Sequence, residues 1–324
     1  MILKTTPEYM DLLNKAVARE IQVSVQYMIQ HTKMEKLVTK KISENILLEK
    51  TTYDKFGEYL KKAALEEMKH LGMIMERIYQ LGGEASTKPS YIKIGDSLKE
   101  MAKINYEDEK NALELYRKII DLAEQLGDKE TRLMFDKIYS EEEKHLLQFE
   151  DYDSILDEPN YSEPKESNWR KIFSDDYIKL LNDALAAEAS AIIQYTNQHE
   201  KASASIHRKK QSALEVITDK NKASVISDIL KSIFKQEMEH FEKISERIFE
   251  IQKEAVADVK PLPQIGAVPE DWINLDRDAE DYAIVLYRNI IKKATEIGDI
   301  RTKKMFEDIL IEEEQHYWIF DNYA

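Results

Sequence analysis

The chain contains one set of six metal-ligand side chains twice, in the same order and at nearly the same spacing. Each set has a single glutamate, a Glu-x-x-His motif, a second single glutamate and a second Glu-x-x-His motif. The first set is Glu20, Glu67, His70, Glu109, Glu142 and His145, and the second is Glu188, Glu237, His240, Glu280, Glu313 and His316. Matching residues lie 168 to 171 positions apart. This pattern predicts a tandem repeat of one domain.

The spacing inside each Glu-x-x-His motif predicts a helix, because residues i and i+3 lie on one helix face. Four helices that each supply their part of the set can hold two metal ions at the centre of a bundle. Four carboxylates balance the charge of two divalent cations, and a mixture of carboxylate and imidazole suits iron or manganese. The sequence therefore predicts two dimetal sites per chain.

A single Glu-x-x-His motif would mean little in a chain with 62 acidic residues, since most glutamates face solvent. The prediction depends on all six positions recurring together. Glu109 and Glu142 are 33 residues apart, and the corresponding pair in the second half has the same separation.

Composition favours an all-α fold and excludes several classes of function. Only 8 Gly and 7 Pro occur among 324 residues, and helix-forming residues dominate. The absence of cysteine excludes disulfides, iron–sulfur clusters, thiol catalysis and a rubredoxin-type module. The net charge of −15 argues against nucleic acid or an anionic membrane as a partner. No signal core or run of 18 apolar residues occurs, so we expect a cytoplasmic protein.

Each half reads as helix, helix, long crossover, helix, short turn and helix. Thr6 and Ser174 have the character of N-caps, and Gly127 and Gly298 are placed to end the third helix of each half. The predicted domains are residues 1–155 and 172–324, joined by a linker at 156–171. Two polar segments, 37–56 and 202–222, show no pattern that assigns their structure.

Two aromatic positions recur beside the first glutamate of each set. Tyr27 and Tyr195 follow that glutamate by seven residues, which is two helical turns on the same stripe. Each is a candidate catalytic tyrosine, redox-active or hydrogen-bonding, and a core tyrosine is the equal alternative. His31 and His199 lie one turn further, where a structural histidine is favoured over a secondary metal site.

Each half also resembles bacterioferritin over about 150 residues. The resemblance is carried by Glu20 with Gln26-Tyr27, by Glu67 to His70, by Ile94-Gly95 and by Glu142 to His145, with the matching residues in the second half. It implies two ferritin-like four-helix bundles, each with one long crossover and a di-iron ferroxidase site. It also implies haem bound by a methionine from each of two subunits. Met68 and Met238 stand at that position, and apolar packing is the alternative.

Three features depart from bacterioferritin. The segment before the first Glu-x-x-His motif is about 15 residues longer than that family suggests. The chain ends at Ala324, eight residues after His316, where the family has a short fifth helix that helps to close a 24-subunit shell. Two subunits are also fused into one chain. We therefore expect an intrachain pseudo-dimer, with a homo-oligomer left open, rather than such a shell.

The predicted function is oxidation of Fe(II) by dioxygen or peroxide at two di-iron sites. A manganese–iron oxidase or a peroxidase is one alternative. A rubrerythrin-type peroxidase is disfavoured by the missing cysteines and by Ala112, where that family carries a glutamate. A haem-binding or metal-sequestering protein without turnover is the second alternative.

Overall fold

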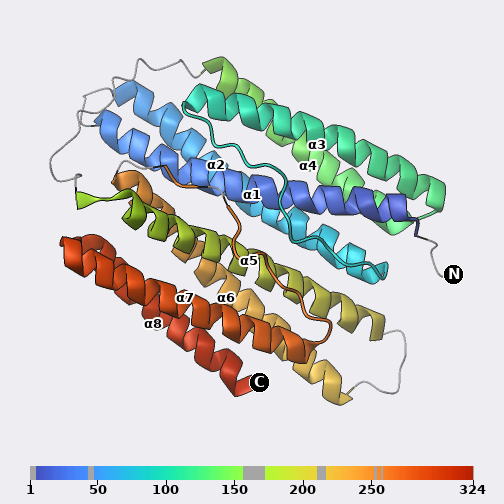
Figure 1. The fold of residues 1–324 in the computed structure, drawn as a ribbon. Coiled ribbons are helices and arrows are strands. Elements are labelled where there is room, and N and C mark those ends of the chain that lie inside the picture. Colours follow the sequence, from blue (N-terminus) through green and yellow to red (C-terminus); the bar gives the residue numbers. More distant parts are fainter. Residues whose placement is uncertain are drawn as a thin grey trace. The chain divides into compact units, whose positions relative to one another are not determined.

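The computed structural model describes residues 5–42, 47–155, 172–209, 217–251, 254–256 and 258–323. The elements in these residues are eight α-helices (Figure 1). The helices of the first half are α1 (Pro7–Ile42), α2 (Leu47–Gln80), α3 (Leu98–Leu126) and α4 (Lys129–Ile155). Those of the second half are α5 (Asp175–Lys209), α6 (Ile217–Glu250), α7 (Pro269–Ile297) and α8 (Ile300–Tyr323). The predicted all-α class is confirmed.

The chain divides into two compact units, each holding one four-helix bundle. One unit comprises Met1–Tyr161 with Ser203–Ala213, and the other comprises Ser162–Ala202 with Leu214–Ala324. The first bundle is built from α1 to α4 and the second from α5 to α8. The predicted linker, 156–171, lies outside the described residues, so the predicted domain boundaries stay predictions.

The helix ends lie where capping chemistry places them. Thr6 accepts a hydrogen bond from the backbone N–H of Tyr9 at 3.1 Å, and Ser174 accepts one from Tyr177 at 3.3 Å. Gly127 and Gly298 adopt left-handed φ angles of 71° and 77° after α3 and α7. A side chain there would be strained, which explains why glycine ends both helices.

One aspartate fastens three helices together at the start of α4, and an equivalent aspartate does so at the start of α8. Asp128 accepts hydrogen bonds from the backbone N–H of Thr131 at 3.1 Å, from Arg77 at 2.7 Å and from the Tyr9 hydroxyl at 3.0 Å. Asp299 makes the same three contacts. Its partners are Thr302, Arg247 and Tyr177. The ends of α1, α2 and α4, and of their counterparts, are thereby set relative to one another.

Each bundle has the single long crossover expected from the sequence. The chain after α2 runs back along its bundle before α3 begins, and the chain between α6 and α7 does the same (Figure 1). The backbone N–H of Ser90 donates to Ala18 O at 2.9 Å, and that of Lys260 donates to Ala186 O at 3.2 Å. These bonds hold both crossovers against the first helix of their own bundle.

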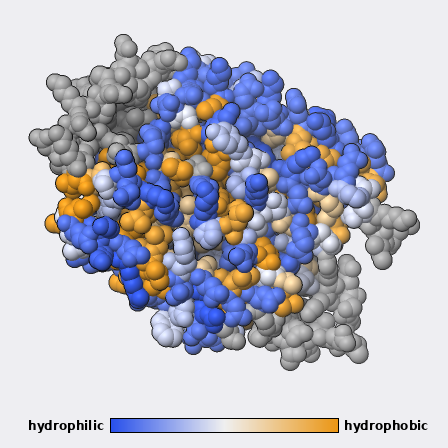
Figure 2. Space-filling model, in the orientation of Figure 1, coloured by the Kyte–Doolittle hydropathy of each residue, from blue (hydrophilic) through white to orange (hydrophobic). Residues whose placement is uncertain are grey.

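The two polar segments without a sequence assignment are largely helical. Helix α1 continues to Ile42 and α2 starts at Leu47, while α5 continues to Lys209 and α6 starts at Ile217. Residues 43–46 and 210–216 lie outside the described part of the chain. No helix in the described residues is both long enough and apolar enough to span a membrane. Hydrophilic residues cover much of the face shown in Figure 2, with apolar patches between them.

Candidate metal centre

The first bundle brings its six predicted ligands together at its centre. Glu20 comes from α1, Glu109 from α3, and the two Glu-x-x-His motifs come from α2 and α4. The side chains form two overlapping groups whose ligand atoms lie within 4.8 Å of one another. One group is Glu20, Glu67, His70 and Glu142, and the other is Glu67, Glu109, Glu142 and His145. Glu67 and Glu142 belong to both groups, so each is placed to bridge two metal ions.

The second bundle repeats this arrangement. Its groups are Glu188, Glu237, His240 and Glu313, and Glu237, Glu280, Glu313 and His316. Glu237 and Glu313 are the shared carboxylates. All twelve predicted ligands are buried, and all of them were predicted from spacing alone.

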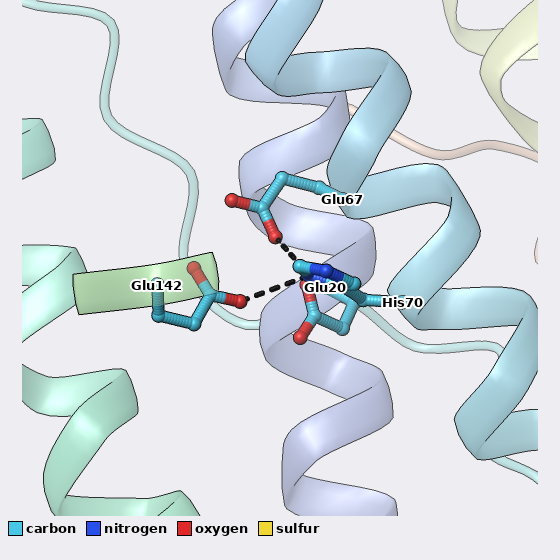
Figure 3. A group of neighbouring side chains, drawn as sticks. All are labelled: Glu20, Glu67, His70 and Glu142. Atoms are coloured by element: carbon cyan, nitrogen blue, oxygen red, sulfur yellow. Dashed lines mark hydrogen bonds and ion pairs between the residues drawn. The ribbon is translucent and has the colours of Figure 1, made fainter. Parts of the chain in front are cut away.

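The histidines point one ring nitrogen into the cluster and the other outward. Nδ1 of His70 lies 3.2 Å from Glu67 and 3.0 Å from Glu142, and Figure 3 shows these carboxylates and Glu20 directed at the ring. Its Nε2 lies 3.0 Å from the carboxylate of Glu141. Metal-bound histidines usually donate their second N–H to a carboxylate in this way, which fixes the ring.

The other three histidines have comparable outer partners. Nε2 of His145 lies 3.0 Å from Glu66, and that of His240 lies 2.7 Å from Glu312. His316 instead meets the amide oxygen of Gln236 at 3.1 Å. Each of these partners directly precedes a ligand glutamate. Sequence reasoning did not single them out, because an acidic run is more often a solvated helix face.

Burial and crowding of like charges shift the pKa values in both clusters. Burial raises the pKa of Glu20, Glu109, Glu188 and Glu280 well above the usual glutamate value. Burial alone would lower the pKa of the four histidines, but the neighbouring carboxylates outweigh it. Hydrogen bonds to Glu142 and Glu67 raise the pKa of His70 and His145 to about 12, and the charge of Glu188 together with the shared carboxylates raises that of His240 to about 12. The carboxylates of Glu237 and Glu313 raise the pKa of His316 to about 9. Protons therefore offset part of the carboxylate charge in both clusters when no metal is bound, and metal binding must displace them.

Comparison with known proteins decides the family. The family model for the ferritin-like domain matches residues 10–157 and 212–324, which is most of both bundles. The chain belongs to the ferritin-like family. The two matched segments fit a tandem duplication of one ferritin-like bundle, as the sequence predicted.

The relatives of this ferritin-like protein are bacterioferritins, each matching about half of the chain. Bacterioferritin of Desulfovibrio desulfuricans is 28% identical over 147 residues, which cover 45% of this chain and 74% of the relative. That of Rhodobacter capsulatus is 30% identical over 142 residues, covering 43% and 76%. A solved structure of the Desulfovibrio protein, which describes its diiron site in different catalytic states, has a TM-score of 0.41, with 49% of this chain and 82% of that one covered.

In the described residues, four tyrosines, rather than the two predicted, donate hydrogen bonds to cluster glutamates of the ferritin-like bundles. Tyr27 donates a short hydrogen bond to Glu109, and Tyr195 donates one to Glu280. The two further tyrosines lie on the third helix of each bundle and donate to the glutamate of the first helix. Tyr116 donates to Glu20, and Tyr287 donates to Glu188. These two follow the third-helix glutamate by seven residues. The same spacing that identified the first pair could therefore have found them.

The first cluster also contains an arginine that the sequence analysis missed. The Nη1 atom of Arg19 lies 3.0 Å from Glu20, 2.9 Å from Glu67 and 3.1 Å from Glu142, and Nη2 makes a short contact with Glu109. The second bundle has Ala187 at the matching position, one residue before Glu188. This difference between two otherwise matching repeats was the sequence feature that could have drawn attention to Arg19.

Among the described residues, the second cluster has buried ligand atoms without a hydrogen bond, and a bound metal ion would supply the missing partner. These atoms are Glu237 Oε1, Glu313 Oε1 and His316 Nδ1. His316 Nδ1 lies only 3.0 Å from Glu237 Oε1, but the orientation makes no hydrogen bond. Nitrogen and carboxylate oxygen atoms oriented this way fit a pair of transition-metal ions.

The remaining predicted residues lie outside the two clusters. Met68 and Met238 are partly buried on α2 and α6, and the haem prediction for them stays a prediction. His31 Nδ1 lies 2.9 Å from Gly57 O, and His199 Nδ1 lies 2.9 Å from Ser227 O. These contacts to the backbone of α2 and α6 favour a structural role for both histidines.

Proposed function

We propose that this ferritin-like protein oxidises Fe(II) with dioxygen or peroxide at a dimetal centre. The observation that carries the proposal is the pair of shared carboxylates, Glu237 and Glu313, between two ligand groups in the second bundle. Each group adds one further glutamate and one histidine. Such a set holds two Fe(II) ions side by side and keeps the total charge near neutral.

The reaction balances without any other cofactor. Two Fe(II) ions lose one electron each, and hydrogen peroxide takes both electrons and two protons to give two water molecules. Dioxygen takes two electrons and two protons from one such pair to give hydrogen peroxide, which a second pair of Fe(II) ions then reduces to water. The bacterioferritin relatives support iron as the metal, and manganese stays the alternative because the same ligands accept it.

The protein's own residues fix the ligands and manage protons. His240 and His316 must be neutral to bind a metal, so each loses the proton that its raised pKa retains in the metal-free cluster. Tyr195 and Tyr287 hold the carboxylates of Glu280 and Glu188 in place. We assign Tyr195, and Tyr27 in the first bundle, as the candidates for a hydrogen-bonding or redox-active tyrosine.

Aerobic oxidation of Fe(II), followed by the near-ultraviolet absorbance of Fe(III), tests this function. The double variant Glu67→Ala/Glu237→Ala removes a shared carboxylate from each bundle. It should lower the rate by at least about 100-fold, to that of buffer alone. Glu314→Gln is the matched control, because Glu314 neighbours a ligand but faces outward and contacts Arg288. Wild-type oxidation in the double variant would refute the proposal.

A further inference from the structure

The four carboxylates of the first cluster already surround a cation. The guanidinium of Arg19 contacts Glu20, Glu67, Glu109 and Glu142. The Arg19 side chain is 9% exposed and each of the four glutamates is 0% exposed. Arg19 therefore lies among the oxygen atoms that would bind the metal ions.

The second cluster has no counterpart to this arginine among the described residues. Ala187 is buried at the matching position. The ion pairs of the second-cluster carboxylates within the described chain are all with His240 and His316. The two clusters also differ in their hydrogen bonding. In the described part of the chain, all the buried ligand atoms that lack a hydrogen bond belong to the second cluster.

An arginine differs from a protonated histidine in what a metal ion must displace. Histidine can lose its proton and stay as a neutral ligand, whereas arginine keeps its charge at any relevant pH. Two divalent ions alone would neutralise four carboxylates, so adding them beside Arg19 would leave one buried positive charge. An unbalanced buried charge is strongly destabilising. Metal binding at the first cluster therefore requires Arg19 to leave it.

The charge of the groove that leads to the first cluster also disfavours metal binding there. A cavity of about 620 Å³ between α2 and α4 ends on His70 and His145. Four lysines line it, namely Lys62, Lys69, Lys137 and Lys144. The matching positions in the second bundle hold Ser232, Glu239, Asp308 and Gln315.

The charge of the approach is thus opposite in the two bundles. Across the lining positions that are charged in either bundle, the first has four lysines against two glutamates, a net charge of +2. The second has three acidic residues against Lys243, a net charge of −2. Divalent cations are repelled from the groove of the first bundle and attracted to the matching positions of the second bundle.

We infer that Arg19 is a built-in cation that takes the place of metal in the first bundle, so that the chain loads its metal pair in the second bundle alone. The first cluster then keeps a cation among its four carboxylates, which helps to hold its bundle together at any metal concentration. This inference rests on the proposed function for the second bundle only.

Native mass spectrometry with Co(II) as the probe tests the inference in the full chain. The wild-type chain should bind two ions, Glu237→Ala should bind none at that site, and Glu67→Ala should still bind two. Four ions on the wild-type chain, or a pair lost in Glu67→Ala and kept in Glu237→Ala, would overturn the inference and leave a dimetal protein. A wild-type pair that survives both changes, or no binding at all, would instead refute the proposed function.

Removing the arginine supplies the reverse test. Arg19→Ala should raise the number of bound Co(II) ions from two to four, with affinity at the first cluster increased by about 100-fold or more. If four crowded carboxylates unfold that variant, Arg19→Gln keeps a polar side chain of similar length, and circular dichroism reports the fold. A folded Arg19→Gln or Arg19→Ala protein that still binds only two ions would overturn the inference.

Discussion

At the scale of single residues, the tyrosines connect opposite helices across each cluster. Tyr287 on α7 donates to Glu188 on α5, and Tyr195 on α5 donates to Glu280 on α7. The same crossed pairing occurs in the first bundle with Tyr116 and Tyr27. Each glutamate that belongs to one ligand group only is therefore held by a hydroxyl from the facing helix.

Tyr287→Phe should destabilise the metal-free protein more than Tyr116→Phe does. Among the described residues, Glu188 would keep its contact with Glu237 and an ion pair with His240 at 3.8 Å, whereas Glu20 would keep the much closer Arg19 at 3.0 Å. We expect Tyr287→Phe to cost about 1–3 kcal/mol of unfolding free energy, as for a buried acceptor left unpaired. Urea denaturation of both variants checks this, and equal losses would contradict it.

Asp276 on α7 provides a pH test, because the first bundle has Asn105 in its place. Burial raises the pKa of Asp276 from 3.8 to about 7, although the hydrogen bond from Gln194 at 2.8 Å favours the charged carboxylate and opposes this shift. The folded state therefore holds a proton that the unfolded state has lost between pH 4 and 7. Stability must fall as pH rises through that window and stay low above it.

Asp276→Asn should therefore stabilise the second bundle by up to about 4 kcal/mol at pH 8, with the gain shrinking towards pH 4. Chemical denaturation of wild type and variant across this range measures the difference directly. A difference that does not change with pH would show that the carboxyl does not titrate as described.

At the scale of helices, the aspartate at the start of α8 combines a cap with a buried ion pair. Asp299→Ala would remove the bond to the Thr302 backbone and leave Arg247 without this partner. We expect a loss of about 2–3 kcal/mol. Asp128→Ala should cost a similar amount in the first bundle, since its contacts are the same. Thermal melts check both values, and an unchanged melting temperature in either variant would contradict the assignment.

Helices also show what sequence could predict and what it could not. The twelve residues of the two clusters could be predicted because i, i+3 spacing fixes which side chains share a helix face, and Thr6 and Gly127 marked helix ends by local chemistry. The segment around 37–56 carried no apolar periodicity, so the continuation of α1 to Ile42 was not assigned. Arg19 was missed because its neighbour Glu20 faces the cluster, and adjacent helical residues point about 100° apart. The long Arg19 side chain bends towards the cluster, and this path is visible only once the helices are packed together.

At the scale of the whole molecule, duplication allows two bundles with one ligand set to differ. Arg19 and the lysines of its groove distinguish the first from the second. Metal should then stabilise one bundle only. At 100 times the dissociation constant of each of the two sites, Co(II) should raise the stability of the second bundle by about 5 kcal/mol and leave the first unchanged.

Differential scanning calorimetry with and without Co(II) checks this unequal effect. One transition should move to higher temperature and one should stay in place. His316→Ala, which removes a second-cluster ligand, should abolish the shift, while His145→Ala should preserve it. A shift of both transitions in the wild-type protein would show that the bundles bind metal alike.

Anomalous X-ray diffraction would show a di-iron centre in the second bundle without any variant or added probe. Crystals of protein purified from its native host should be measured at the iron and manganese absorption edges. We predict two iron peaks about 3.5–4 Å apart, bridged by Glu237 and Glu313, and none among the carboxylates around Arg19. Manganese peaks, or an absence of metal between Glu237 and Glu313, would contradict the account.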